Sequence, residues 1–166
     1  MDGLSERDLV SELASPRFWR RQTAFRLLAE GGGGQQAADI ALLVDDGTSR
    51  AGVVSALRLL AYLEIDDTRA VQRALSHPDP SVRTHAVQVA AASVAQNSDL
   101  RVAVMALADE PDVGVVRQVA VAMGNTSDPR AVALLAKIAR THGSVLWMDA
   151  AVMTAAADRA GELLEA

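Results

Sequence analysis

Apolar residues recur every three or four positions along almost the whole chain, in stretches separated by short polar turns. This spacing places the apolar side chains on one face of an α-helix, and no stretch shows the sustained alternation of a strand. All five prolines lie at boundaries between the stretches, where they interrupt no helix. The pattern therefore predicts an all-α protein.

The turn signals group the predicted helices into pairs, each with a shorter first and a longer second helix. The predicted first helices cover residues 5–14, 35–44, 68–76, 98–108 and 130–141. The predicted second helices cover residues 16–30, 50–63, 80–95, 113–123 and 145–157, and residues 158–165 open a further pair. Ser5, Ser15 and Ser98 are predicted N-caps. Gly124 and Asn125 are predicted to end a helix in the left-handed conformation.

One alanine recurs in the middle of every second helix, at intervals of 30 to 34 residues. These anchor alanines are Ala24, Ala56, Ala86, Ala120 and Ala151. A fixed period in this range indicates stacked supersecondary units. We therefore expect a right-handed α-solenoid (an α-α superhelix) of about five helix pairs, forming a single domain over residues 1–166.

Two segments carry a family resemblance, Asp-Pro-Ser-Val-Arg-Thr-His-Ala at 79–86 and Asp-Val-Gly-Val-Val-Arg-Gln-Val-Ala at 112–120, together with Asp-Pro-Arg-Ala at 128–131. They resemble HEAT repeats, in the short form of phycobilin-lyase-type HEAT-like proteins. The pattern fails at Val53 and Met148, so the second and fifth repeats are degenerate. The resemblance implies a structural ladder in which an arginine reaches an aspartate of a neighbouring turn. Its members would be Arg21, Arg83, Arg117, Asp79 and Asp112.

A narrower resemblance covers residues 15–28, 117–124 and 147–152. These segments are similar to the HEAT region of planctomycete-type membrane-bound dehydrogenase/cytochrome proteins. The resemblance implies a bacterial module of a larger protein, exported to the cell envelope. It also leaves open an accessory role beside an oxidoreductase, or a lyase-type role in handling a cofactor. The dehydrogenase and haem residues of those proteins do not occur in this sequence.

Composition excludes several kinds of site. The chain has no cysteine, and its three histidines form no pair at metal-ligand spacing, so we expect no metal, no cofactor and no catalytic constellation. No run of 18 apolar residues or signal-peptide pattern is present, and the sequence does not indicate a compartment. The net charge of −5 argues against a nucleic-acid partner. We therefore expect a protein that is not an enzyme.

The helix at residues 16–30 combines arginines with aromatic residues. Arg17, Arg20, Arg21 and Arg26 surround Phe18 and Trp19. A groove for single-stranded nucleic acid uses this combination. The favoured interpretation is a solvated helix face with two core aromatics at a terminal repeat.

The second helices change character along the chain. Three positions of each second helix lie on one helical face: five and one residues before the anchor alanine, and two residues after it. We expect this face to line the inner surface. This face is polar in the first three repeats, with Arg58 and His85 as candidate partner contacts, and apolar in the last two. The apolar part comprises Val115, Val119, Leu146, Trp147, Ala150 and Met153.

We expect this apolar stripe to dock an adjacent domain, another copy of the chain or a peptide, because exposed apolar stripes mark contact surfaces. The alternative is that tighter curvature or the final helix buries these residues. The sequence as a whole predicts a non-catalytic interaction scaffold that binds a protein partner or neighbouring domain, with a homo-oligomer as one form of that binding.

Overall fold

The computed structural model of the chain describes residues 4–31, 33–45 and 49–165. These residues form α-helices and short 3-10 turns, and no strand occurs among them. The chain divides into two compact units, residues 1–86 and 87–166. The all-α class expected from the sequence is confirmed.

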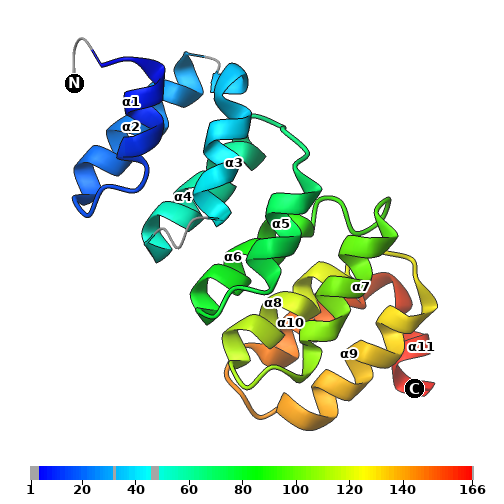
Figure 1. The fold of residues 1–166 in the computed structure, drawn as a ribbon. Coiled ribbons are helices and arrows are strands. Elements are labelled where there is room, and N and C mark those ends of the chain that lie inside the picture. The colour runs from blue at the N-terminus through cyan, green and yellow to red at the C-terminus, as the bar shows by residue number, and fades with distance from the viewer. Residues whose placement is uncertain (1–3, 32, 46–48, 166) are drawn as a thin grey trace. The chain divides into compact units, whose positions relative to one another are not determined.

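Three helix pairs come first in chain order, and the second helix of the third pair runs past residue 86, where the first unit ends. The pairs are α1 (Glu6–Glu12) with α2 (Phe18–Glu30), α3 (Ala37–Asp45) with α4 (Arg50–Tyr62), and α5 (Thr68–Leu75) with α6 (Pro80–Ala90), and the short turn η1 (Gly33–Gln36) precedes α3. The first helix packs on the second within the pairs α1/α2 and α3/α4 (Figure 1). Between pairs, α1 contacts α3, α3 contacts α5, and α2 contacts α4. First and second helices therefore form two separate rows, as stacked repeats require.

The second unit continues with two further pairs and an additional helix. The elements are α7 (Ser98–Ala106), η2 (Leu107–Asp109), α8 (Val113–Met123), α9 (Pro129–His142), α10 (Met148–Ala155), η3 (Ala157–Arg159) and α11 (Ala160–Glu165). Helix α8 contacts α7, η2, α9 and α10, and α9 contacts α11 (Figure 1). The second helices α8 and α10 are thus neighbours, and so are the first helices α9 and α11. The paired, solenoid-type stacking expected from the sequence is confirmed within this unit as well.

The anchor alanines lie where the helices pack. Ala24, Ala56, Ala86 and Ala120 are completely buried, and Ala151 is 8% exposed. A methyl group lets neighbouring helices approach closely, and alanine costs nothing in helix propensity. The repeat period read from the sequence is therefore the period of these buried contacts.

Local capping accounts for most helix starts. Ser5 and Asp8 form a reciprocal capping box at α1. The side chains of Ser49, Asp112 and Asp128 accept backbone N–H groups at the starts of α4, α8 and α9. At α7 the predicted cap is wrong by one residue. Asn97, not Ser98, accepts the N–H groups of Asp99 and Leu100.

Three second helices are shorter than predicted. Helix α2 begins at Phe18 with Arg17 in the capping position, so the predicted N-cap at Ser15 is wrong; the Ser15 carbonyl accepts the Arg21 guanidinium. Helix α6 ends at Ala90 rather than near residue 95, and a run of turns covers residues 91–96. Helix α10 begins at Met148 rather than near 145, because Trp147 adopts a left-handed backbone with φ of 67°.

Two glycine predictions also need correction. Gly124 ends α8 with a right-handed φ of −67°, and Asn125 is not left-handed either. Gly124 instead allows close packing, since a Cβ there would lie 3.0 Å from the Ala155 Cα. Within the glycine run, Gly31 caps α2 and residues 33–36 form η1, while residue 32 lies outside the described residues. Residues 46–48 of the predicted turn before α4 also lie outside them.

Candidate interaction surface

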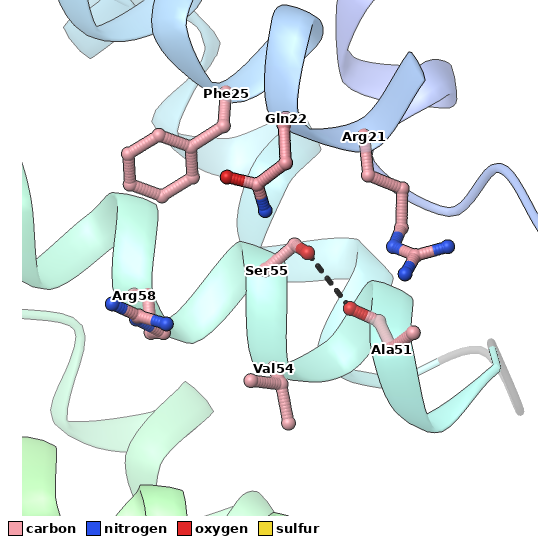
Figure 2. A pocket seen from close by; sticks show the side chains of 7 residues that line it. All are labelled: Arg21, Gln22, Phe25, Ala51, Val54, Ser55 and Arg58. Carbon is pink, nitrogen blue, oxygen red and sulfur yellow. Dashed lines mark hydrogen bonds between the residues drawn. The ribbon is translucent and has the colours of Figure 1, made fainter. Parts of the chain in front are cut away.

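A pocket of about 200 Å³ lies between the second helices α2 and α4 in the first unit. Its lining residues are Arg21, Gln22 and Phe25 from α2, and Ala51, Val54, Ser55 and Arg58 from α4. Figure 2 shows the three α2 side chains pointing toward α4, with Gln22 between Phe25 and Arg21. The pocket is a product of the repeat stacking, because α2 and α4 occupy equivalent places in successive repeats.

An aromatic pair stands at the Phe25 side of the pocket. The Phe25 ring meets the Tyr62 ring edge-on, with centroids 6.1 Å apart and an interplanar angle of 64°. Phe25 is half-buried, whereas Tyr62 is 66% exposed at the end of α4. The pair offers an apolar surface with a free edge to whatever approaches α2 and α4.

Arg21 is fixed in place by the turn before its own helix. Its Nη1 donates to the Ser15 carbonyl at 2.7 Å, and its guanidinium lies 5.8 Å from the Phe18 ring centroid. Arg83 repeats the arrangement, donating from Nη1 to the carbonyls of His77 at 2.7 Å and Pro78 at 2.9 Å. In both repeats the arginine therefore caps backbone carbonyls of the preceding turn.

The two ladder aspartates serve mainly as helix caps. Asp112 accepts the N–H groups of Gly114 and Val115. Asp79 accepts the Ser81 N–H at 2.8 Å and pairs with Arg50 at 3.6 Å. Although partial desolvation favours the neutral acid, the Ser81 hydrogen bonds and the Arg50 charge hold the pKa of Asp79 below its usual range. The pairing of Arg117 with an aspartate stays a prediction.

Charge compensation is uneven among the arginines of α2 and α4. Arg20 contacts Glu12, Arg26 pairs with Glu30, and Arg50 pairs with Asp79. Arg21 and Arg58 form no ion pair with any residue that the structure describes. These two arginines are also the two that line the pocket.

The aromatics at the start of α2 are not core residues, so the favoured sequence interpretation is wrong on this point. Phe18 is 68% exposed and Trp19 is 57% exposed. Arg20 lies 5.8 Å from the Trp19 ring centroid, and Arg21 lies equally close to that of Phe18. Because these rings stack on their neighbouring guanidinium groups and not on the core, they extend the exposed aromatic surface of α2.

The apolar stripe expected in the second unit divides into a buried and an exposed part. Val115 and Val119 are completely buried, so their expected role as partner contacts is corrected. They belong to α8, which α7, η2, α9 and α10 surround. The rest of the stripe lies in the open: Leu146 is 74% exposed, Trp147 66% and Met153 60%, and Ala150 is exposed too.

Two candidate residues from the sequence remain to be placed, His85 and Arg58. His85 is half-buried on α6, and Arg58 is exposed in the pocket. No group of three or more possible metal ligands occurs in the described parts of the chain. Within the same residues, no helix combines the length and apolar character needed to cross a bilayer.

Sequence reasoning missed Gln22, Phe25 and Tyr62. It searched the same face of every second helix, but a groove between two neighbouring helices is lined by different flanks of each. On α4 the pocket uses the predicted inner face, with Ser55 one residue before the anchor alanine and Arg58 two after it. On α2 it uses the positions three and two before the anchor and one after it. A search for the flank of α2 that faces α4 would have found Gln22 and Phe25.

A family model described as HEAT repeats matches residues 68–155, which is more than half of the chain. The chain belongs to the HEAT repeat family. The matched segment runs from α5 to the end of α10, so it includes α8 and its buried anchor alanine. No curated protein matches the chain. HEAT repeats are generally non-enzymatic and commonly serve as scaffolds for protein interaction.

Proposed function

We propose that this HEAT-repeat protein is a non-catalytic scaffold that binds an extended segment of a protein partner. The observation that carries the proposal is the pocket between α2 and α4, lined by side chains of two successive repeats. Solenoid repeats expose a row of equivalent helices, and a segment lying across that row meets the same kind of groove at each step. Such binding needs complementary shape and polar contacts, not a reactive group.

The exposed aromatics support this function. Phe18, Trp19 and Tyr62 are all more than half exposed on or beside α2 and α4. Aromatic and arginine side chains are enriched among the residues that dominate binding energies at protein interfaces. An exposed surface that combines both kinds next to a pocket suits a partner that inserts side chains.

The test is selection of binding peptides from a displayed random library with the full chain as bait. Selected peptides are then measured against the Gln22→Trp variant, in which the exposed Gln22 is replaced by a side chain large enough to fill the pocket. Gln96→Trp, at an exposed position in the second unit, is the matched control. We expect enriched peptides that bind the wild type and the control and are lost with Gln22→Trp. Failure to enrich any peptide contradicts the scaffold function, and equal binding to both variants contradicts the use of this pocket.

A second contact surface is proposed on α10. Leu146 and Trp147 just before α10, and Ala150 and Met153 within it, are all exposed. Patches of exposed apolar residues on soluble proteins mark association sites. We propose a second copy of the chain as the occupant, with a neighbouring domain as the alternative outcome of the same experiment. The single-domain organisation of residues 1–166 within a larger protein is part of this proposal.

An alternative function follows from the resemblance to phycobilin-lyase-type and planctomycete-type proteins. It is an accessory module of an oxidoreductase or a lyase-type protein that handles a cofactor, with His85 and Arg58 of the first unit as contributing groups. Titration of the chain with haem and with a bilin tests it. A saturable absorbance shift that His85→Ala abolishes favours this alternative, and an unsaturable shift rejects it.

A further inference from the structure

We propose that the pocket between α2 and α4 recognises an acidic peptide segment, with one carboxylate held by Arg58 and another by Arg21 at the opposite end (Figure 2), and an apolar side chain placed against Phe25. This inference rests on the proposed scaffold function and names the chemistry of its partner.

The first argument is the charge of these two helices. Helices α2 and α4 contain five arginines, Arg20, Arg21, Arg26, Arg50 and Arg58, and a single acidic residue, Glu30. The chain as a whole has a net charge of −5. The second-helix row of the first unit is therefore basic within an acidic protein. Charge complementarity across an interface selects a partner of opposite sign.

The second argument is that the two arginines without a carboxylate partner among the described residues both line the pocket. The carboxylates of Glu12, Glu30 and Asp79 each meet one arginine of α2 or α4. Arg21 and Arg58 have no such carboxylate among the residues described. Guanidinium groups bind carboxylates through two parallel hydrogen bonds, which makes them well suited to an acidic ligand. Arg21 keeps nitrogen donors for this purpose, because its hydrogen bond to the Ser15 carbonyl uses only Nη1.

The third argument is the neutral polar centre of the pocket. Gln22 lies between Phe25 and Arg21 and is exposed, so its amide offers both a donor and an acceptor (Figure 2). The Ser55 hydroxyl donates to the Ala51 carbonyl at 2.8 Å, which leaves its oxygen to accept. An extended peptide presents N–H and C=O groups in alternation. The centre of the pocket therefore matches a peptide main chain, while its ends match side chains.

A nucleic acid fits this surface less well, although it combines arginine with aromatic side chains. A phosphate backbone carries a charge at every nucleotide and needs a continuous track of cations. Here Glu12 and Glu30 neutralise Arg20 and Arg26, the arginines on either side of the pocket along α2. Carboxylates beside the track would repel successive phosphates. The observations thus favour isolated carboxylates over a polyphosphate chain.

The experiment measures fluorescence anisotropy of labelled peptides with the full chain. The probes are a peptide of alternating Glu and Leu, the same peptide with Gln for each Glu, and a 15-nucleotide oligo-dT. The variants are Arg58→Glu and the matched control Arg69→Glu, which makes the same charge change at an exposed position on α5. Circular dichroism checks that both variants keep the helical fold.

We expect the Glu-Leu peptide to bind the wild type more tightly than the Gln-Leu peptide. We expect Arg58→Glu to weaken that binding by about tenfold or more, the loss of one charge-assisted hydrogen bond, and Arg69→Glu to change it by less than about twofold. Equal binding of the two peptides, or equal effects of the two variants, overturns the inference. Tighter binding of oligo-dT that displaces the peptide also overturns it, in favour of nucleic acid.

The outcomes separate this inference from the proposed function. Selected peptides that are lost with Gln22→Trp but carry no acidic residues leave the scaffold function standing and refute the acidic partner. Absence of any selected peptide refutes both.

Discussion

Helices α4 and α8 occupy equivalent places in their repeats, but the same helical face is polar and accessible on α4 and apolar and buried on α8. Around its anchor alanine, α4 places Ser55 and Arg58 at half-buried and exposed positions that line a pocket. At the same two positions α8 has Val119 and Ala122, and both are completely buried. The comparison teaches that a position within the repeat does not fix its exposure. The exposure of that position depends on which neighbouring elements cover the helix.

The difference has a visible cause within the second unit. Helix α8 is contacted by elements on several sides, and its end is so close to α10 that a Cβ at position 124 would lie 3.0 Å from the Ala155 Cα. The main chain is tied in as well, since Arg159 donates to the Met123 carbonyl and Asn125 donates to the Ala91 carbonyl. In the first unit, by contrast, the flank of α4 that carries Ser55 and Arg58 faces open space beside α2.

The largest expected effect breaks this comparison directly. Val119→Asp places a carboxylate in a site with no exposed surface, so we expect a loss of about 4 kcal/mol or more in unfolding free energy. Ser55→Asp, at the matched position on α4, should cost less than about 1 kcal/mol because Ser55 keeps access to water. Urea unfolding followed by circular dichroism measures both. Equal losses in the two variants would show that the two helices are covered alike.

A second prediction concerns the arginines. Arg101 is only 16% exposed, donates from Nε to Asp128 at 3.0 Å, and donates from Nη1 to the Val94 carbonyl at 2.7 Å. Arg101→Ala leaves that carbonyl and carboxylate without their donor, and we expect a loss of about 2 kcal/mol. Arg58→Ala should leave the unfolding free energy within about 0.5 kcal/mol of the wild type.

The arginine comparison is read from the same urea titrations. A stability loss for Arg58→Ala equal to that for Arg101→Ala would mean that Arg58 holds the fold together and is not reserved for a ligand.

The sequence carried the local features of both units well. The bounds predicted for α8, residues 113–123, are those observed, and the predicted cap at Ser5 is observed as well. Caps and prolines act within one turn of helix, so the residues that decide them are neighbours in sequence. The anchor alanines were found for a related reason, because each repeat packs in the same way against the next.

Features that depend on distant packing could not be predicted. Val119 was assigned to an exposed stripe because its position is polar in earlier repeats, and nothing adjacent in sequence reveals how closely α10 covers α8. Phe18 and Trp19 were assigned to the core by their residue type, yet they stack on guanidinium groups at the surface. The flank of α2 that faces α4 was also missed, since choosing it requires knowing which helix is the neighbour.

A third, smaller effect appears only in acid and again concerns the second unit. Hydrogen bonds from the Arg130 side chain and backbone, and from Arg101, hold the pKa of Asp128 far below its ordinary value of 3.8. The folded state therefore binds fewer protons than the unfolded state. The contribution of Asp128 to stability is present above about pH 4 and is lost as the pH falls through the lowered pKa.

Asp128→Asn keeps the helix cap but removes the titrating charge, so we expect a less steep loss of stability below pH 4 than in the wild type. Thermal unfolding between pH 2 and pH 7 measures the slope. Asp8 and Asp79, whose pKa values are also lowered, keep part of the acid sensitivity in the variant. Identical pH profiles for variant and wild type would remove Asp128 from this account.

The smallest expected effect on stability sharpens the contrast between α8 and α10. Met153 and Leu146 are largely exposed. Met153→Asp and Leu146→Asp should therefore each change the unfolding free energy by less than about 0.5 kcal/mol. Val119→Asp, in the same expected stripe, should cost far more because Val119 is buried. If a second copy covers α10, sedimentation equilibrium should show a wild-type dimer that both variants dissociate, because a carboxylate in an apolar contact must be desolvated without a partner. Val121→Asp, at a position 44% exposed on α8, is the control and should leave the dimer intact. A wild-type monomer at all concentrations would reject the second copy as the occupant and leave a neighbouring domain. Unfolding of Met153→Asp would instead mean that this face of α10 is covered, as the Val119 face of α8 is.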